Sequence, residues 1–201
     1  MNDLVIAQLA REPVPGEVKT RMQPGLSTQR ALDLHTAMVR YMVERLSPSA
    51  SLELWVDGAE DHPLFIECLA LGARRIVRQP PGDLGERMAH IASELLLLSR
   101  KVVLVGSDAP TLGAAQVSDM SRALDSADLC FVPALDGGYV MLGLRTFVPE
   151  VFTGIEWGTG RVLSQSLDAA AAAGRQVELL EPVPDIDVAE DLRWLPPDLA
   201  W

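Results

Sequence analysis

Short aliphatic runs alternate with longer amphipathic stretches along the first half of the chain. The first run spans residues 4–10, and another strongly apolar run spans residues 102–105. Between them, apolar positions recur every three or four residues, as they do on the buried face of a helix. Such alternation is typical of strand–helix units that build a parallel sheet. The predicted strands cover residues 4–10, 52–56, 74–78 and 102–105, and the predicted helices cover residues 31–46 behind a Ser27 cap, 64–71 and 84–98.

The second half of the chain breaks this alternation at one point. Strand-like runs at 129–133 and 139–144 are separated by a short segment that contains Asp136-Gly137-Gly138. A parallel crossover needs a dozen or more residues, so one of these strands is predicted to run antiparallel. The remaining predictions are helices at 116–124 and 161–173, a strand at 176–180, a short helix from about residue 188 and an irregular tail at 195–201.

These elements fit one α/β domain over residues 1–201, folded as a three-layer α/β/α sandwich around a mostly parallel, mixed sheet. With 201 residues and 48% hydrophobic content, the chain can bury one substantial core. No apolar stretch approaches the roughly 20 residues that span a bilayer, and the N-terminal run lacks the features of a secretory signal. A soluble, cytoplasmic protein without a membrane partner is therefore expected.

Charge and the types of metal-binding residue narrow the function classes. The formal net charge of −11 argues against nucleic-acid binding, because such binders present a broad positive face. Cys68 and Cys130 lie in apolar runs without metal-ligand spacing, and both are predicted to be buried thiols. The three histidines are scattered, which argues against a zinc site or a histidine-based catalytic pair. Any metal is therefore expected to have oxygen ligands.

The loop after the first predicted strand, residues 11–21, concentrates basic residues in an otherwise acidic chain. Gly16 permits close approach of the backbone to a ligand, and Lys19 and Arg21 are suited to clamping phosphates. In an open α/β sheet, ligands bind outside the carboxyl ends of the strands, where this loop lies. The alternative is a solvated basic loop, because the segment matches neither of the common glycine-rich phosphate loops.

Carboxylates follow other predicted strands. Asp108 comes directly after the fourth predicted strand and is a candidate Mg²⁺ ligand, or alternatively a turn residue ahead of Pro110. Asp185 and Asp187 alternate along the chain, so both can face Asp108 across the sheet. Alternatively, Asp187 and Glu190 form a capping box for the short helix that follows.

The segment at 82–87 has two interpretations of equal weight. Asp83 and Glu86 form another capping pattern, which would make the segment purely structural. Its glycines and Arg87 would also suit close approach of a base or a phosphate.

Two later segments are open in the same way. The Asp136-Gly137-Gly138 segment is typical of a tight turn, although its glycines can also admit a substrate that Asp136 or Tyr139 contacts. Trp157 can stack on a sugar or a base, although tryptophans are more often part of the core.

Taken in order, these segments resemble an uncharacterised, glycosyltransferase-A-like branch of the nucleotide-diphospho-sugar transferase superfamily, often called radical-SAM/selenodomain-associated transferase 1. The resemblance spans nearly the whole chain. The sequence differs from the family pattern in two places: Arg11 stands where Lys is expected, and the run Val140-Met141-Leu142 replaces a more aromatic one. The matching segments are 13–21, 82–88, 106–112, 136–139 with 143–144, Trp157, and 185–187 with 190–192.

The resemblance implies a GT-A type fold and a metal-dependent transferase that uses an activated nucleotide. Mg²⁺ or Mn²⁺ would be held by Asp108 and Asp187, with Asp185 as an alternative second ligand. The catalytic residues would be Lys19, Arg21 and Asp108. The nucleotide would contact Arg11, Pro15, Gly16, Lys19, Arg21, Gly82, Asp83, Gly85 and Arg87, and the acceptor would contact Asp136, Gly137, Gly138, Tyr139 and Trp157.

The resemblance favours transfer of a nucleotidyl group from a nucleoside triphosphate to a phosphorylated small molecule, with release of pyrophosphate. Glycosyl transfer from a nucleotide-sugar is the first alternative, and a catalytically silent nucleotide-binding or scaffold protein is the second. The expected partners are the nucleotide and a small-molecule acceptor. The expected oligomeric state is a monomer or a homodimer.

Overall fold

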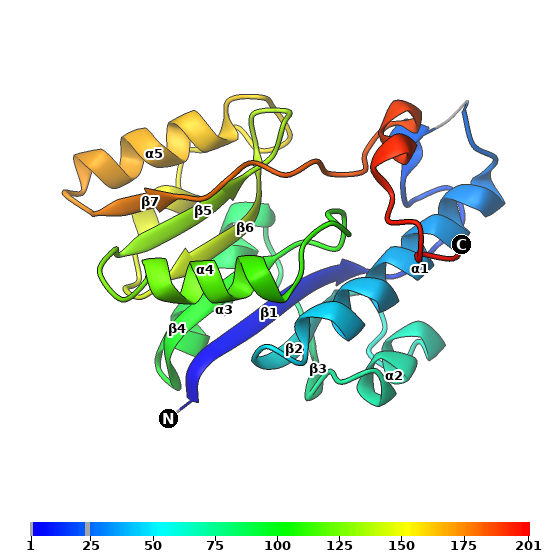
Figure 1. Ribbon diagram of the computed structural model, residues 1–201, viewed down its shortest axis with the longest axis horizontal. Coiled ribbons are helices and arrows are strands. Elements are labelled where there is room, and N and C mark those ends of the chain that lie inside the picture. The colour runs from blue at the N-terminus through cyan, green and yellow to red at the C-terminus, as the bar shows by residue number, and fades with distance from the viewer. Residues whose placement is uncertain (1, 23–24) are drawn as a thin grey trace.

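A computed structural model describes residues 2–22 and 25–201, in which seven strands form a single sheet (Figure 1). Their order across the sheet is β3-β2-β1-β4-β6-β5-β7, so the first strand of the chain lies inside the sheet, between β2 and β4. The strands are β1 (Asn2–Arg11), β2 (Ser51–Asp57), β3 (Arg75–Arg78), β4 (Ser99–Val105), β5 (Leu129–Pro133), β6 (Tyr139–Leu144) and β7 (Val177–Leu179).

Helices connect most of these strands, and the described residues contain five α-helices and three short 3-10 helices. The α-helices are α1 (Thr28–Leu46), α2 (Pro63–Ala70), α3 (Leu84–Leu96), α4 (Ala114–Ala123) and α5 (Val162–Ala172), and the 3-10 helices are η1 (Thr20–Met22), η2 (Pro149–Phe152) and η3 (Ala189–Trp194).

Strand β6 runs antiparallel to both of its neighbours, whereas the other paired strands are parallel. Gly143 of β6 pairs with Val103 of β4 on one side and with Cys130 of β5 on the other. The predicted mixed sheet is therefore confirmed. Because β6 is reversed, its first residue, Tyr139, lies at the same edge of the sheet as the last residues of β1 and β4.

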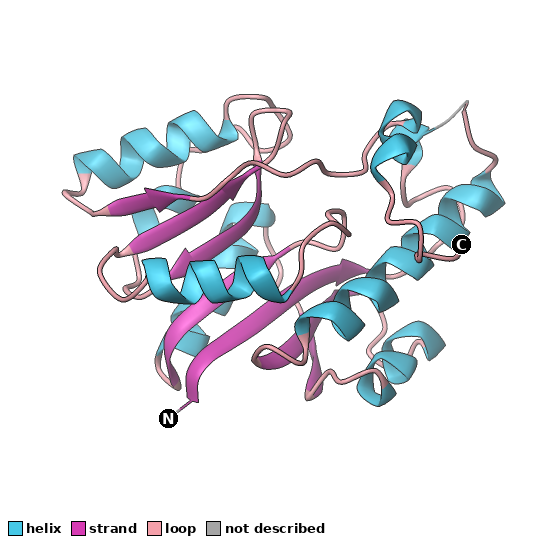
Figure 2. Cartoon of the chain, in the orientation of Figure 1, coloured by secondary structure: helices cyan, strands magenta, loops and turns pink. Residues whose placement is uncertain are grey.

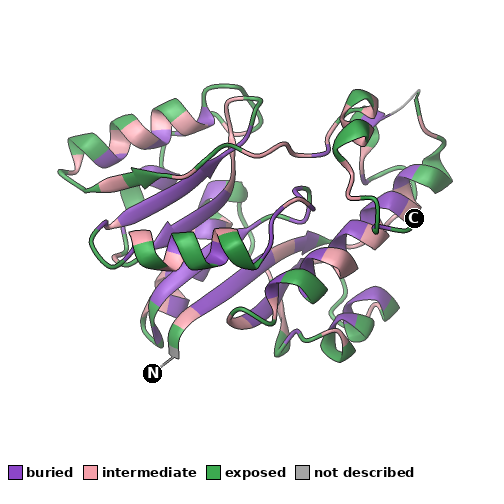
Figure 3. Cartoon of the chain, viewed as in Figure 1, coloured by how far each residue is buried: buried purple, intermediate pink, exposed green. Residues whose placement is uncertain are grey.

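Helices cover both faces of the sheet, which gives three layers (Figure 2). Successive residues of β1 serve opposite faces, as the period of a strand requires. Ile6 packs in a cluster with residues of α1, α2 and α4, whereas Val5 packs in a cluster with residues of α3 and α5. The inner strands are buried, whereas the edge strands β3 and β7 and the outer faces of the helices are partly or fully exposed (Figure 3). The predicted α/β/α sandwich is confirmed.

Local sequence determines where the two longest helices begin. The Ser27 hydroxyl accepts a hydrogen bond from the Arg30 amide at 3.2 Å, as its predicted role as cap of α1 requires. At α3, the Asp83 carboxylate accepts from the Glu86 amide at 2.9 Å, and the Glu86 carboxylate accepts from the Asp83 amide at 2.9 Å. This capping box was one of the two predicted interpretations of segment 82–87. The five predicted apolar positions of α1 are all buried: Ala31, Leu34, Met38, Met42 and Leu46.

The C-terminal segment, residues 185–201, leaves the end of the sheet beyond β7 and crosses to α1 (Figure 1). Its buried side chains, Ile186 and Leu199, form a third core cluster with Met22 and two residues of α1. The predicted capping box of Asp187 and Glu190 is wrong. The Asp191 carboxylate instead accepts hydrogen bonds from the amides of residues 187 and 188, because η3 begins one residue later than the local pattern indicates.

Cys68 and Cys130 are buried free thiols, as predicted. Burial raises the pKa of each thiol to about 12, so both stay protonated and unreactive at neutral pH. Among the described residues, no helix is both long enough and apolar enough to span a bilayer.

Candidate active site

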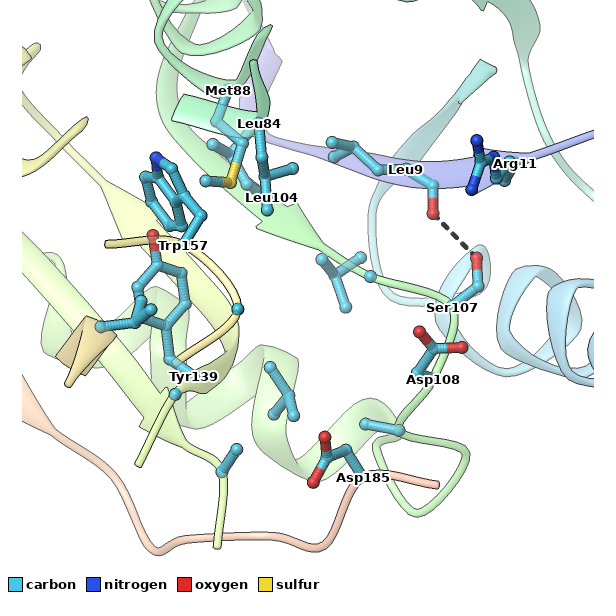
Figure 4. A pocket seen from close by; sticks show the side chains of 18 of the residues that line it. Leu9, Arg11, Leu84, Met88, Leu104, Ser107, Asp108, Tyr139, Trp157 and Asp185 are labelled. Atoms are coloured by element: carbon cyan, nitrogen blue, oxygen red, sulfur yellow. Dashed lines mark hydrogen bonds between the residues drawn. The ribbon is translucent and has the colours of Figure 1, made fainter. Parts of the chain in front are cut away.

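A cleft of about 430 Å³ lies at the carboxyl ends of β1 and β4 (Figure 4). Strands β2 and β3 lie on one side of β1, and β4, the next strand along the chain, lies on the other side of β1. The crevice between such strands is where open α/β sheets bind their ligands. Residues from the sheet, from α1 and α3, and from the loops that follow β3, β4, β5 and η2 line the cleft, together with one residue of the C-terminal segment.

Buried hydrogen bonds hold the ends of β1 and β4 together at the floor of the cleft. The Gln8 amide donates to the Val39 carbonyl at 3.1 Å and to the Ser107 hydroxyl at 3.1 Å. Ser107 in turn donates to the Leu9 carbonyl at 2.9 Å (Figure 4). These contacts fix the turn after β4, and Asp108 at its tip therefore faces the cleft.

Asp108 forms an ion pair with Lys19 at 2.6 Å. The two side chains differ sharply in exposure, because 53% of the Asp108 side chain is accessible but only 4% of the Lys19 side chain. Desolvation acts to raise the pKa of Asp108, but the charge of Lys19 and its hydrogen bond outweigh desolvation and hold that pKa below its usual range. Asp108 is therefore ionised at neutral pH.

Lys19 also joins the first loop to the C-terminal segment. Its ammonium group donates to the Ile186 carbonyl at 2.5 Å, and the Ile186 amide donates to the Asp108 carbonyl at 2.8 Å. Lys19 has a φ of +50°, a conformation that non-glycine residues rarely adopt. Three segments that are distant in sequence thus meet at one buried ammonium group, which lies behind Asp108.

Arg21 and Asp187 form a second ion pair at 2.6 Å, and both side chains are exposed to solvent. The hydrogen bond and the charge of Asp187 raise the pKa of Arg21. Arg21 lines the cleft, but Asp187 does not, whereas its neighbour Asp185 does. Asp185 therefore shares the cleft with Asp108, whereas Asp187 is paired with Arg21 outside the lining, so the two carboxylates differ in their access to a ligand.

Asp108, Asp136 and Asp185 form an acidic wall of the cleft. Desolvation is the largest cause that raises the pKa of Asp185, and the charges of Asp136, Asp187 and Asp108 raise it further. In residues 2–22 and 25–201, no group of three or more His, Cys, Asp and Glu side chains is arranged to hold a metal by itself. A cation here would therefore need a bound ligand or water to complete its coordination.

Arg11 and His35 line the cleft on the same side as Asp108. His35, from α1, donates a ring N–H to the Arg11 carbonyl, at a distance of 2.9 Å, and burial lowers its pKa. The imidazole is therefore neutral at neutral pH. Within the described part of the chain, Arg11 is the cleft-lining arginine that has no carboxylate partner, since Arg21 and Arg87 are both paired. Sequence reasoning set the histidines aside and missed His35.

A polar corner, defined as Asp57, Gln79 and Arg87, lies where β2 ends. Arg87 donates to the Asp57 carboxylate at 2.8 Å and to the Gly82 carbonyl at 2.8 Å. Gln79 donates to the Trp55 carbonyl at 2.9 Å, which holds its side chain against the end of the sheet. Arg87 is therefore accessible for the predicted contact with a nucleotide. No motif in the sequence indicates that Asp57 and Gln79 also line the cleft.

Aromatic side chains form the remaining wall. The rings of Tyr139 and Trp157 meet nearly edge-on, with centroids 6.4 Å apart and an interplanar angle of 80°. Gly85 lies directly against Trp157, because an added Cβ would come within 2.6 Å of the indole nitrogen. Burial raises the pKa of Tyr139, so its phenol stays protonated.

The turn between β5 and β6 shows that its two predicted interpretations are compatible. The Asp136 carboxylate accepts a hydrogen bond from the Gly138 amide at 2.9 Å, and Gly137 has a φ of +92°. A Cβ at Gly137 would come within 2.2 Å of the Gly160 carbonyl oxygen. The turn therefore requires glycine for structural reasons, while Asp136 remains at the cleft surface.

The cleft brings together about half of the predicted site residues. Those that line it are Arg11, Arg21, Arg87, Asp108, Asp136, Gly138, Tyr139 and Trp157. The predicted residues that lie outside the lining are Pro15, Gly16, Lys19, Gly82, Asp83, Gly85, Gly137 and Asp187. Several of the latter support the lining residues through the contacts described above.

Comparison with protein families identifies the group to which the chain is related. Residues 21–159 match the family described as uncharacterised proteins conserved in bacteria (DUF2064). The chain belongs to this family. A search of curated proteins finds no match.

Solved structures agree with the predicted fold. A Desulfovibrio desulfuricans G20 protein, provisionally named a nucleotide-diphospho-sugar transferase, is 31% identical, with a TM-score of 0.85 over 94% of this chain and 84% of that one. A CMP-2-keto-3-deoxy-manno-octonic acid synthetase bound to CTP is 10% identical, with a TM-score of 0.55 over 96% of each chain. The 4-diphosphocytidyl-2C-methyl-D-erythritol synthase of Anaerococcus prevotii is also 10% identical, with a TM-score of 0.62 over 96% of this chain and 94% of that one.

The 31% identical structure shows a fold of the nucleotide-diphospho-sugar transferase type, and the two distant structures share this fold. The predicted GT-A type fold is therefore confirmed. At the level of enzyme class, the prediction of a transferase that uses an activated nucleotide is also confirmed. The nucleotide, the acceptor and the metal are separate questions.

Proposed function

We propose that the protein transfers a nucleotidyl group from a nucleoside triphosphate to a phosphorylated small molecule, with release of pyrophosphate. The observation that carries this proposal is the distribution of charge in the cleft. The carboxylates of Asp108, Asp136 and Asp185 line the same cavity as the guanidinium groups of Arg11 and Arg21. A triphosphate bound with a divalent cation presents both signs of charge and complements such a cavity.

Arg11 and Arg21 are the proposed phosphate ligands. Arg11 has no competing carboxylate in the described structure, and Arg21 can exchange its exposed partner Asp187 for a phosphate oxygen at little cost. Lys19 has the proposed role of orienting Asp108 from behind, since its side chain is only 4% exposed. This role differs from the direct phosphate contact that the loop sequence suggests.

Mg²⁺ or Mn²⁺ fits the chemistry of the acidic wall. Carboxylates are hard oxygen ligands, and Mg²⁺ commonly uses one or two of them, with waters and phosphate oxygens completing the octahedron. Desolvation raises the pKa of Asp185 most, the neighbouring carboxylates raise it further, and a cation would relieve the repulsion among these carboxylates. We assign Asp108 and Asp185 as the first candidates, with Asp187 available once Arg21 releases it. The bound cation would neutralise charge on the phosphates.

In the proposed reaction, an oxygen of the acceptor phosphate attacks the α-phosphorus of the triphosphate. The bond from that phosphorus to the bridging oxygen breaks, and pyrophosphate leaves with the electron pair. A phosphate monoester is largely ionised at neutral pH, so the attack requires no general base. The protein contributes positioning and charge compensation, and Tyr139 remains a neutral wall residue.

Glycosyl transfer from a nucleotide-sugar is the second candidate function. It is favoured by the provisional name of the 31% identical relative. The same cleft would hold a diphosphate, and the departing group would be a nucleoside diphosphate. The two candidates therefore differ in the product that turnover releases.

The first experiment is a thermal-shift screen of the four nucleoside triphosphates and common nucleotide-sugars, each with Mg²⁺, Mn²⁺ or EDTA. A ligand at 100 times its Kd adds about 2.7 kcal/mol of stability. We expect metal-dependent stabilisation by one triphosphate, followed by pyrophosphate release when a phosphorylated acceptor is added. Replacement of Asp108 by Asn should lower the rate by about 100-fold or more.

Release of a nucleoside diphosphate without pyrophosphate would contradict nucleotidyl transfer and favour the glycosyl alternative. The absence of any shift, with every nucleotide and metal, would favour the silent-scaffold alternative over both.

A further inference from the structure

One end of the cleft is lined by apolar and aromatic side chains. We call this end the apolar compartment and define it as Leu84, Met88, Leu104, Tyr139, Trp157 and Val162. These residues come from α3, β4, β6, the loop before α5 and the first residue of α5, so distant segments build one wall. Figure 4 shows Leu84, Met88, Leu104, Tyr139 and Trp157 gathered on one side of the cavity, away from Asp108 and Asp185.

Packing contacts hold one side of the apolar compartment, and part of the compartment remains uncovered. Trp157 is fixed by its edge-on contact with Tyr139 and by its close approach to Gly85. Leu84 is 46% exposed even though it lies on the cleft wall. An apolar ligand group would cover this surface. Binding would cost little conformational entropy, because the packed side chains of the wall are already held in place.

The polar corner of Asp57, Gln79 and Arg87 lies at a different part of the same edge. Asp57 ends β2, whereas Tyr139 begins β6, and the order β2-β1-β4-β6 separates them by three strand spacings. At about 4.8 Å per spacing, Asp57 and Tyr139 are roughly 14 Å apart along the sheet edge, and α3, which carries both Arg87 and Leu84, connects the two places. Each can therefore receive a different part of the bound substrates.

A nucleobase is chemically better suited to the polar corner than to the apolar compartment. The edges of a base carry N–H, nitrogen and carbonyl groups, and each costs free energy when it is buried without a partner. The polar corner offers carboxylate, amide and guanidinium groups to these edges. The apolar compartment contributes only an indole nitrogen and the phenol oxygen of Tyr139, and that oxygen is buried. A base placed there would leave most of its polar atoms unpaired.

We propose that the apolar compartment binds the non-reacting end of the acceptor. The acceptor is then a phosphate or phosphonate whose other end is an aromatic ring or a compact branched alkyl group, rather than a polyhydroxylated sugar. This inference rests on the proposed nucleotidyl transfer, since that reaction defines which substrate is the acceptor. The reacting phosphate would lie toward Asp108, where the cleft carries its charged groups.

Calorimetric titration with simple phosphates tests the inference. The probes are phenyl phosphate and isopentyl phosphate, compared with glycerol 3-phosphate and inorganic phosphate, each with Mg²⁺ and the triphosphate identified by the thermal-shift screen. One methylene in an apolar pocket is worth roughly 10–200-fold in discrimination. We expect the two apolar phosphates to bind at least about tenfold more tightly than glycerol 3-phosphate.

Matched variants test whether the apolar compartment causes the preference for apolar phosphates. Leu84→Ser changes a 46% exposed leucine on the cleft, and Leu97→Ser changes a 78% exposed leucine at the other end of α3. We expect Leu84→Ser to weaken phenyl phosphate by about fivefold or more, with less than twofold change for glycerol 3-phosphate and for the triphosphate. Leu97→Ser should change none of these. Val162→Thr provides a second test, because it adds a hydroxyl group at nearly constant volume.

Equal binding of phenyl phosphate and glycerol 3-phosphate would overturn the inference. Equal weakening of the triphosphate and phenyl phosphate by Leu84→Ser would also overturn it, because the base would then occupy the compartment. A third outcome would separate the two proposals. If no triphosphate binds, but phenyl phosphate still binds more tightly than glycerol 3-phosphate and Leu84→Ser still weakens it, the proposed nucleotidyl transfer is contradicted. The proposal that the compartment binds apolar phosphates would then still be supported.

Discussion

Lys19 and Asp108 form an ion pair in which one partner is buried and the other is open to the cleft. Replacing Lys19 by Met should lower the free energy of unfolding by about 1–3 kcal/mol, less than the loss for a fully buried pair, because water still reaches Asp108. Replacing Asp108 by Asn should cost a similar amount, since the buried ammonium of Lys19 would lose its charged partner and keep only neutral oxygen acceptors. Urea unfolding measures both changes.

The double variant separates the pair from the surrounding packing. If the two side chains stabilise each other, Lys19→Met with Asp108→Asn should cost clearly less than the sum of the single changes. Additive losses would mean that each residue acts through other contacts. In that case Lys19 would not have the positioning role proposed for it.

Asp128 gives the protein a defined pH dependence far from the cleft. The Gln176 amide donates to its carboxylate at 3.1 Å and Arg145 donates at 3.2 Å, and both contacts hold the pKa of Asp128 below its usual range. The folded state therefore binds this proton less readily than the unfolded state. The resulting stability is present above the unfolded pKa of about 3.9 and is lost as the pH falls through the folded value.

Replacing Asp128 by Asn should thus lower Tm by about 2–4 °C at pH 7, corresponding to about 1 kcal/mol, with a smaller difference near pH 3. Thermal unfolding at several pH values checks this. An equal loss at both pH values would show that shape or packing, and not ionisation, is the cause.

At the scale of elements, helix α3 packs closely against neighbouring segments because Gly85 has no side chain. An added Cβ at Gly85 would come within 2.5 Å of the Phe152 carbonyl oxygen and 2.6 Å of the Trp157 indole nitrogen. Gly85→Ala should therefore lower the free energy of unfolding by about 1–3 kcal/mol, even though alanine is the better helix former. Chemical denaturation measures the loss, and a shift in tryptophan fluorescence would report the displaced ring.

Gly106→Ala is the matched control for this change. No atom lies within 4 Å of the Cβ that alanine would add at Gly106, and the residue does not have a positive φ. Its unfolding free energy should stay within about 0.5 kcal/mol of the natural protein. If both variants lose the same stability, crowding against Trp157 is not the reason.

The sequence was most informative where a local pattern has one physical solution. The cap at Ser27, the capping box of Asp83 and Glu86, and the antiparallel strand after Gly138 all depend on contacts within a few residues. The Asp187 and Glu190 pattern was equally good locally, but η3 begins one residue later. The competing contacts are the burial of Ile186 and its hydrogen bond with Asp108, and both are distant in sequence.

The same distinction applies to the candidate site. Asp108 and Arg21 follow strands or motifs, so their place at the sheet edge can be predicted. Asp57 and His35 reach the cleft only because β2 lies beside β1 and α1 packs above it, and neither stands in a motif. Lys19 lies in a clear motif, but the motif does not predict that its side chain is buried. The burial depends on the C-terminal segment, which covers Lys19.

At the scale of the molecule, the C-terminal segment holds the first loop closed. Ile186 is fully buried against Met22 and α1, and its backbone contacts both Lys19 and Asp108. Ile186→Ala should cost about 2–4 kcal/mol and should also free the loop at 11–22. We expect faster tryptic cleavage after Lys19 and Arg21 under native conditions, followed by mass spectrometry.

Leu46→Ala is the control, because Leu46 is equally buried but belongs to a different core cluster. It should lose similar stability without selective cleavage of the first loop. If the two variants are cleaved at the same sites and rates, the loop opens only when the whole protein unfolds.

The position of β1 between β2 and β4 has a consequence for how the chain acquires its structure. At synthesis rates of 5–20 residues per second, residues 99–105 leave the ribosome roughly 5–20 s after β1. During that interval one edge of β1 has no partner strand, although its side chains are among the most apolar of the chain. Folding must therefore wait for a pairing of high sequence separation, which slows it and leaves an edge on which nascent chains can associate.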